Sequence, residues 1–405
     1  MKILAFLSRA KIKALAPAFL LGVYMFAVTL GLVNGGVWAT LGIAGAILLA
    51  LMLWAADKKF PWPDQKIAIL TLLFLGLSVA LAFFSSFQEK ALSTTFKMAS
   101  IFLPLLLLSS PRLLALGQRL RTEAVDLAEL LTFGFVFLSL ALVTFSFLVG
   151  FESSPITKLN RGFSYGLLLA APLLAWAMQH SKEQGYALLA ALVLATLLTH
   201  SRVAQAGVIV ALGVFVVARF WPVLVTWLLG FGMILSLLWP FAARWSFLHT
   251  HDFVTSKLPA SWGARMEIWD YMAYRIAEKP ILGWGLGTSD QLVWDKPHGD
   301  FYHYLIIPAA HPHNAVIQLW AEMGLIGLAF GALACFWLLR SASKLEESFR
   351  PFALAALAGG CVLLLAAYNL WTDSLWAAFA LTVYLFASLG KIKPSLSAKL
   401  QDEGQ

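Results

Sequence analysis

The chain has 405 residues, of which 60% are hydrophobic and only 12% are charged, and its mean hydropathy is +0.80. A soluble domain has roughly 45 to 50% apolar residues, so this composition excludes a water-soluble globular protein. The net charge of +8 is also seen in nucleic-acid-binding proteins, but most of it lies in short segments between apolar runs. That placement is typical of the cytoplasmic side of a membrane protein, and no nucleic-acid partner is expected.

Apolar runs of about 17 to 23 residues recur along the chain, and this length crosses roughly 30 Å of hydrocarbon at 1.5 Å per residue. The predicted fold is therefore all-α, an integral membrane protein with about twelve transmembrane helices. The run at 98–110 is short and contains Pro104, so it either extends upstream toward Phe87 or forms a re-entrant loop. The predicted spans are 15–33, 37–55, 67–84, 98–110, 127–149, 164–178, 186–200, 203–219, 222–240, 313–339, 352–370 and 374–390.

The positive-inside rule indicates the topology of these spans. With the N-terminus in the cytoplasm, eighteen Lys and Arg residues of the short loops lie inside and five lie outside. This favours nine transmembrane helices in 1–240, a periplasmic loop over 241–312, three helices in 313–390 and a cytoplasmic tail over 391–405. The first apolar run is longer than that of a signal peptide, so it is expected to remain as an uncleaved helix. Cys335 and Cys361 fall inside apolar runs, and no disulfide framework or thiolate site is predicted.

The segment 241–312 interrupts the pattern because it is long and rich in Trp, His, Pro and charged residues. Within it, Arg265–Glu278 has apolar residues at helical spacing and is followed by Pro280, which predicts an amphipathic helix. A flexible turn is predicted at Gly283–Gly287. A helix on the membrane surface beneath this loop would form a roof over a site that faces the lipid.

Three polar residues recur in the tenth span, where ionisable groups at membrane depth are unfavourable. Asn314, Gln318 and Glu322 are spaced four residues apart and therefore lie on one face of the helix. Two interpretations stay open. The face is either a hydrogen-bonded seam between helices or part of a site.

Several ionisable residues fall at the predicted outer ends of helices, where they can face one cavity. Arginine has a planar, permanently charged fork that suits phosphate oxygens, and three arginines together favour a diphosphate over a carboxylate. For each arginine alone, snorkelling at the interface is the commoner explanation. The residues are Arg161, Arg202, Arg265, His313 and Asp373.

Histidines cluster in and after the loop, and their spacing allows two interpretations. A zinc site needs further carboxylate or thiolate ligands, which no nearby pattern supplies, and an Asp-X-Asp motif is missing from the chain. A neutral histidine alternatively serves as a general base near neutral pH. No metal and no other cofactor is therefore expected. The histidines are His249, His251, His298, His303, His311 and His313.

One motif resembles that of a known family. His313-Asn314, nine further residues and then Gly324-Leu325-Ile326-Gly327 resemble the signature of the O-antigen ligase and polymerase superfamily. Two other stretches are similar to the same family, at 199–202 (THSR) and at 265–290 (RMEIWDYMAYRIAEKPILGWGLGTSD). The resemblance covers roughly 155–340, whereas the first 150 residues match only in hydropathy.

The resemblance implies a bacterial inner-membrane glycosyltransferase of the GT-C type, with its site facing the periplasm. It would transfer a polysaccharide from undecaprenyl diphosphate to a lipid A-core acceptor and so form lipopolysaccharide. A single large loop favours a ligase, while an O-antigen polymerase and a protein O-oligosaccharyltransferase remain alternatives. From other classes, a membrane transporter or lipid flippase and a noncatalytic scaffold also stay open.

A mechanism follows from these residues and the implied donor. His313 would accept the proton of an acceptor hydroxyl, and the arginines at 161, 202 and 265 would stabilise the departing diphosphate without a metal ion. Asp373 or Glu322 would orient His313 or pair with an arginine. In-line attack would invert the anomeric centre.

Overall fold

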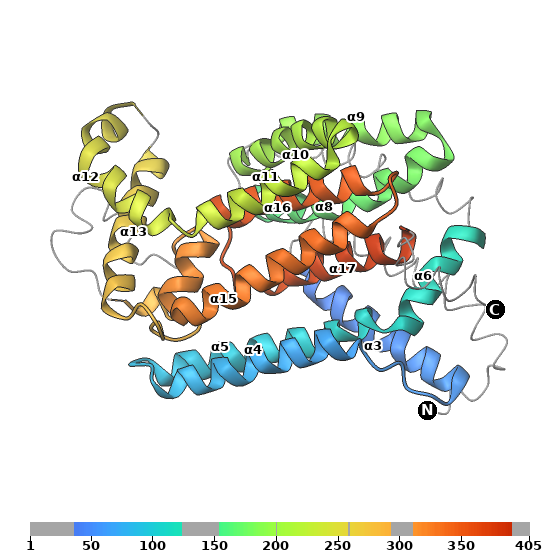
Figure 1. The fold of residues 1–405 in the computed structure, drawn as a ribbon, viewed down its shortest axis with the longest axis horizontal. Coiled ribbons are helices and arrows are strands. Elements are labelled where there is room, and N and C mark those ends of the chain that lie inside the picture. The colour runs from blue at the N-terminus through green and yellow to red at the C-terminus, as the bar shows by residue number, and fades with distance from the viewer. Residues whose placement is uncertain (1–35, 124–153, 200, 258–259, 293–310, 391–405) are drawn as a thin grey trace.

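The computed structural model describes residues 36–123, 154–199, 201–257, 260–292 and 311–390, and within these ranges the chain is helical with no β-strand (Figure 1). The predicted all-α class is therefore confirmed for this part of the chain. Its elements are α3 (Val37–Asp57), α4 (Gln65–Phe83), α5 (Gln88–Leu105), η1 (Leu106–Ser109), α6 (Pro111–Glu123), α8 (Ser154–His180), α9 (Lys182–Leu198), α10 (Arg202–Phe220), α11 (Pro222–Ser236), α12 (Trp239–Lys257), α13 (Ala260–Glu278), η2 (Ser289–Gln291), α15 (Ala315–Lys344), α16 (Arg350–Ala366) and α17 (Asp373–Leu389).

Local sequence explains where several of these helices begin. The side chain of Asp64 accepts hydrogen bonds from the backbone N of Lys66 and Ile67, at 3.0 and 3.1 Å, and so caps α4. Ser201 caps α10 in the same way through the backbone N of Ala204. Pro222 occupies the first turn of α11, where its missing N–H removes no helical hydrogen bond. Polar caps thus separate apolar helices that composition alone would merge.

Six described helices are long and apolar enough to cross a membrane, and each coincides with a predicted span. The helix that contains the short run at 98–110 begins at Gln88, ten residues before that run. The six are Val37–Asp57, Gln65–Phe83, Gln88–Ser109, Asn160–His180, Arg202–Phe220 and Ala315–Lys344.

The remaining predicted spans are shorter or lie elsewhere. Pro222–Ser236 and Trp239–Phe247 pass as one span only together, across a bend of 59°. Arg350–Ala366 and Asp373–Leu389 are shorter apolar helices. Helix α9 has 17 residues and is also shorter than the six. The spans predicted at 15–33 and 127–149 lie outside the described residues. Twelve spans therefore remain a prediction.

Helix α17 lies at the centre of the bundle and packs against α3, α5, α6 and α8, while α16 packs against α8 and α10. Small residues allow the helices to approach closely: a Cβ on Gly42 would lie 3.2 Å from that of Ala377, and one on Gly207 would lie 3.6 Å from the carbonyl oxygen of Gly359. Small residues at such contacts are typical of membrane helices, because lipid supplies no hydrophobic drive for their association.

The two ends of the bundle differ. The α12–α13 hairpin lies at one end together with the α4–α5 turn, and α6 lies at the opposite end (Figure 1). Apart from the α12–α13 segment, the first end carries Lys90, Lys97, Arg161 and Arg202 in the described ranges. The opposite end carries Lys58, Lys59, Lys66, Arg112, Lys182, Arg219, Arg340, Lys344 and Arg350. Under the positive-inside rule the α6 end is expected to be cytoplasmic, and this orientation remains a prediction.

The segment after α11 differs from the sequence prediction in extent. Helix α13 begins at Ala260, five residues before the predicted start, and ends at Glu278 as predicted. It is preceded by the 19-residue helix α12, which mixes apolar residues with His, Thr and charged residues. The α12–α13 hairpin then positions the residues described next.

Candidate functional site

His313 lies immediately before α15 in a turn that fixes its side chain. Its φ of 55° is a left-handed conformation, and the following Asn314 caps α15 by accepting hydrogen bonds from the backbone N of Val316 and Ile317. The Nδ1 of His313 contacts the carbonyl oxygen of Ala367, at 2.8 Å. A carbonyl oxygen only accepts, so Nδ1 carries the proton and Nε2 is left as the free acceptor nitrogen.

His311 shares that acceptor. Its Nε2 lies 3.2 Å from the same Ala367 oxygen, and the centroids of the His311 and His313 rings are 4.0 Å apart. Burial, with smaller contributions from the nearby His313, Arg161 and Arg265, lowers the pKa of His311 to about 4. Burial also lowers the pKa of His313, and Arg265 adds to this effect. Both rings are therefore neutral at neutral pH.

Arg265 reaches this pair from α13. Trp269, one helical turn later on the same face, donates a hydrogen bond from Nε1 to the carbonyl of Pro312, at 2.7 Å, and so joins α13 to the histidine turn. The Nε atom of Arg265 is buried and has no hydrogen-bond partner among the described residues. Burial also lowers the pKa of this guanidinium, as expected for a partly desolvated cation.

Arg161, in the third turn of α8, and Arg202, the first residue of α10, lie at the same end of the bundle. Arg161 is exposed near the start of α8 and is close enough to act on the pKa of His311. Arg202 is exposed at the start of α10, which runs antiparallel to α16 because Gly207 meets Gly359 and Phe215 meets Phe352. The start of α10 therefore lies at the end of α16, beside Ala367.

The predicted polar face of α15 is confirmed as a buried seam. Asn314 donates from Nδ2 to the carbonyl of Leu365, at 3.2 Å. Gln318 donates from Nε2 to Asn369 Oδ1, at 2.9 Å, and accepts from the backbone N of Leu370, at 2.9 Å. The face thus fixes the turn between α16 and α17, which contains Ala367.

Glu322 completes the seam, because its carboxylate accepts hydrogen bonds from four donors. Its carboxylate accepts from the backbone N of Gly287 (2.5 Å), Ser289 Oγ (2.6 Å), Gln318 Nε2 (3.1 Å) and the indole N–H of Trp371. It therefore joins α15, the α16–α17 turn and the glycine loop that follows α13. The predicted role of orienting His313 belongs in the structure to the Ala367 carbonyl, because the carboxylate of Glu322 is occupied by these donors.

The glycine loop, residues 283–287, is fixed rather than flexible. Its Trp284 and Gly285 donate backbone hydrogen bonds, both of 2.8 Å, to the carbonyls of Ala321 and Glu322. These carbonyls are free because α15 is kinked at Gly324, which has a φ of 63° and a ψ of −159°. A Cβ on Gly324 would lie 2.0 Å from the carbonyl oxygen of Ile281, so only glycine fits.

The second motif glycine and the last predicted acid have local roles. A Cβ on Gly327 would lie 2.4 Å from that of Met323, so the turn after the kink also requires glycine. Asp373 accepts from the backbone N and Oγ of Ser374, at 2.8 and 3.2 Å, in the first turn of α17. It lies two residues after Trp371 and therefore at the same end of the bundle.

No three His, Cys, Asp or Glu residues lie close enough to hold a metal ion within the part of the chain that the structure describes. His298 and His303 lie outside that part. His249 is exposed on α12, where its Nδ1 contacts the carbonyl of Trp245 at 2.8 Å. The histidine cluster of the sequence is thus divided, with the His311–His313 pair at the site and His249 apart from it.

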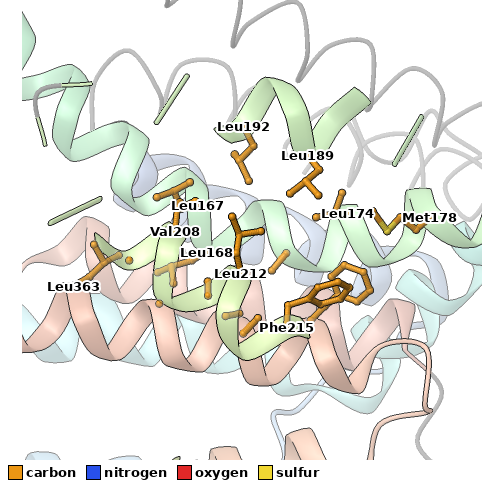
Figure 2. A pocket seen from close by; sticks show the side chains of 17 residues that line it. Leu167, Leu168, Leu174, Met178, Leu189, Leu192, Val208, Leu212, Phe215 and Leu363 are labelled. Carbon is orange, nitrogen blue, oxygen red and sulfur yellow. The ribbon is translucent and has the colours of Figure 1, made fainter. Parts of the chain in front are cut away.

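An apolar groove runs from this end of the bundle along α8, α10 and α16, with α9 on a further side (Figure 2). Leu167, Val208 and Leu363 line it near the arginine-bearing helix ends. Met178 and Phe215 line it toward the opposite end. All 17 lining residues are apolar or glycine. The groove therefore suits a hydrocarbon chain and begins near Arg161 and Arg202.

Sequence reasoning placed His311 in the histidine cluster with His313 but missed three other residues of this site, Asn369, Trp371 and Ser289. These three contact Gln318 or Glu322 of α15 from distant parts of the chain, so their positions depend on the tertiary structure.

The central region of the chain is similar to known proteins. Residues 187–332 match the family described as O-Antigen ligase, a range that includes Arg202, Arg265, His313 and Glu322. The chain is 29% identical over 193 residues to a protein of Rickettsia conorii and 31% identical over 199 residues to one of Rickettsia bellii, both named "Putative polysaccharide ligase". Each match covers 45% of this chain and 45% of the relative, so the chain matches under half of their length. No solved structure matches the chain. The resemblance to the O-antigen ligases is therefore confirmed over this central region.

Proposed function

We propose that this O-antigen ligase-like membrane protein transfers a polysaccharide from undecaprenyl diphosphate to a lipid A-core acceptor on the periplasmic side of the inner membrane. The observation that carries the proposal is the neutral His313, held by Ala367 beside the unpartnered Nε of Arg265. A base for a hydroxyl and a cation for a phosphate lie together at one membrane face.

The donor is supported by two features that meet at that face. The arginines at 161, 202 and 265 suit the oxygens of a diphosphate, and the buried Nε of Arg265 lacks a protein partner that a bound anion would replace. The apolar groove extends along α8 to Leu167 and along α10 to Val208 (Figure 2), each six residues from the arginine of the same helix. A lipid with a diphosphate head and a hydrocarbon tail matches both features at once.

In the proposed reaction, an acceptor hydroxyl oxygen attacks the anomeric carbon of the donor while its proton moves to Nε2 of His313. The bond from the anomeric carbon to the diphosphate oxygen breaks, and the diphosphate leaves with its charge stabilised by Arg265, Arg202 and Arg161. The donor supplies the energy of the new bond, so neither a nucleotide nor a metal ion is required. In-line attack inverts the anomeric centre, as in a GT-C type inverting glycosyltransferase.

The polar groups of α15 support a transferase over a transporter. Transporters place charged groups near the midplane, where they bind the substrate or coupling ions. Glu322, the acid of the α15 seam, is instead occupied by four donors of the protein. The ionisable groups left for a substrate lie at one end of the bundle.

The test separates the two proposed roles. His313→Ala should bind polyprenyl-diphosphate glycan normally but lose transfer by about 10²- to 10⁴-fold, because a base acts on the acceptor proton. Arg265→Ala should lose transfer and weaken donor binding, and Arg265→Lys should restore only part, because an ammonium lacks the bidentate fork.

Two control variants lie outside the site. His249→Ala removes an exposed histidine on α12, and Arg219→Ala removes an exposed arginine at the opposite end of the bundle. Both should transfer at the wild-type rate. Near-normal transfer by a correctly inserted His313→Ala protein would show that His313 is structural and would refute the proposed base.

A further inference from the structure

A stripe of six exposed apolar side chains continues from α11 across the bend into α12. The spacing of its members alternates between four and three residues, so the first three share one face of α11 and the last two share one face of α12, with Leu238 in the 59° bend between the helices. Each is between 56% and 74% exposed. The apolar stripe consists of Trp227, Phe231, Ile234, Leu238, Phe241 and Trp245.

Length explains why the stripe must extend beyond α11. Its 15 residues rise roughly 22 Å, which is less than the roughly 30 Å of a hydrocarbon core. Trp239–Phe247 is tilted by 59° from α11, and its nine residues therefore add about 7 Å along the same direction. With the two linking residues, the chain reaches the edge of the hydrocarbon near Trp245.

We propose that the first turns of α12 cross the boundary between the hydrocarbon and the headgroups of the bilayer, with the apolar stripe as their lipid-binding face. The occupant is the lipid interface because the stripe is continuous with the lipid-facing side of α11. Its far end also has the composition of an interfacial belt, with Trp245 beside the exposed Arg244. Arg244 suits the phosphate of a headgroup.

The opposite face of α12 connects this anchor to the site. Ala243 is buried in a cluster with Ala264, Ile268 and Trp269 of α13, and the rings of Trp239 and Trp269 are 5.5 Å apart. Trp269 in turn holds the turn of His313. The anchor therefore sets the height of α13, and of Arg265 on it, relative to the lipid headgroups. This last consequence rests on the proposed function, whereas the membrane contact of α12 does not.

The test measures depth rather than activity. Cysteines at Phe241 and Trp245, in a chain with Cys335→Ala and Cys361→Ala, carry nitroxide labels in reconstituted vesicles. Accessibility to oxygen is compared with accessibility to a water-soluble nickel chelate. Phe231→Cys is the control within the lipid, and the exposed Gln291→Cys is the aqueous control. We expect oxygen-to-nickel ratios several-fold below that of position 231 and several-fold above that of position 291.

Two results would overturn the proposal. Labels at 241 and 245 that are as accessible to nickel as position 291 would place α12 in water. Labels that are immobilised and reached by neither reagent would mean that protein, such as a second copy of the chain, covers the stripe. The conservative Trp245→Phe variant gives a second measurement, because the tryptophan emission that it loses relative to the wild type is that of Trp245. Brominated lipids should quench this part of the emission. Absence of quenching contradicts the proposal. Because neither readout needs substrate, failure here is distinguishable from failure of the ligase proposal.

Discussion

Glu322 offers the sharpest prediction about what holds the site together. Four donors converge on its carboxylate, two on each oxygen. Glu322→Ala leaves Gly287 N, Ser289 Oγ and Trp371 Nε1 without this acceptor, whereas Gln318 Nε2 keeps its bond to Asn369. Each unsatisfied buried donor costs about 1 to 3 kcal/mol, so a loss of at least about 3 kcal/mol is expected.

Glu322→Gln should be milder. If the amide oxygen replaces Oε2, it keeps the hydrogen bonds from Gly287 and Trp371, and Ser289 can reverse to accept from the new amide. Only Gln318 Nε2, itself a donor, then faces the new NH₂ group, and the lost hydrogen bond costs about 1 to 3 kcal/mol of stability. The order of stability should be wild type, Gln variant, then Ala variant.

Thermal unfolding in detergent measures this order, with the exposed Glu183→Gln as a matched control that should change little. The Ala variant should also lose protection of the glycine loop, residues 283–287, from hydrogen exchange, because Gly287 loses its acceptor. An Ala variant as stable as the wild type, with the loop still protected, would refute the reasoning that Glu322 joins the three segments.

Gly324→Ala should prevent folding, because its Cβ would overlap the Ile281 carbonyl. The control Gly232→Ala has open space around its Cβ and should retain wild-type thermal stability. Equal thermal stability of the two variants would contradict the kink at Gly324. Because burial lowers the pKa of His313 from 6.5, transfer should stay constant from neutral pH to below pH 6.5, and a rate that already falls at pH 7 would contradict a neutral base. A cysteine at the exposed Ser261 should react with a membrane-impermeant reagent from the periplasm and one at Ser343 should not; the reverse pattern would invert the topology.

Hydropathy predicted the helices well, because the requirement to satisfy the backbone in lipid leaves few alternatives. It did not predict the bend after Ser236, because the run stays apolar through Trp239. The signal of the bend is instead Pro240, which has no N–H to donate to the carbonyl of Ser236. Nor could hydropathy predict that the glycine loop pairs with α15. That contact depends on carbonyls freed by the kink at Gly324, a feature of backbone geometry rather than of hydropathy.

The site was predicted in its chemistry more than in its contacts. The spacing of Asn314, Gln318 and Glu322 indicated one buried face, and the structure gives the partners of that face in the α16–α17 turn. The partner of His313 could not be predicted, because the carbonyl of Ala367 lies 54 residues away and a backbone oxygen leaves no mark in the sequence.

The most direct test of the central claim is transfer by the purified protein itself. Vesicles that contain the protein are supplied with undecaprenyl-diphosphate glycan and lipid A-core, in the presence of EDTA and without nucleotide. The account predicts lipopolysaccharide that carries the glycan and release of undecaprenyl diphosphate. Correctly inserted protein that yields no product, or that yields it only after a divalent metal is restored, would contradict the account.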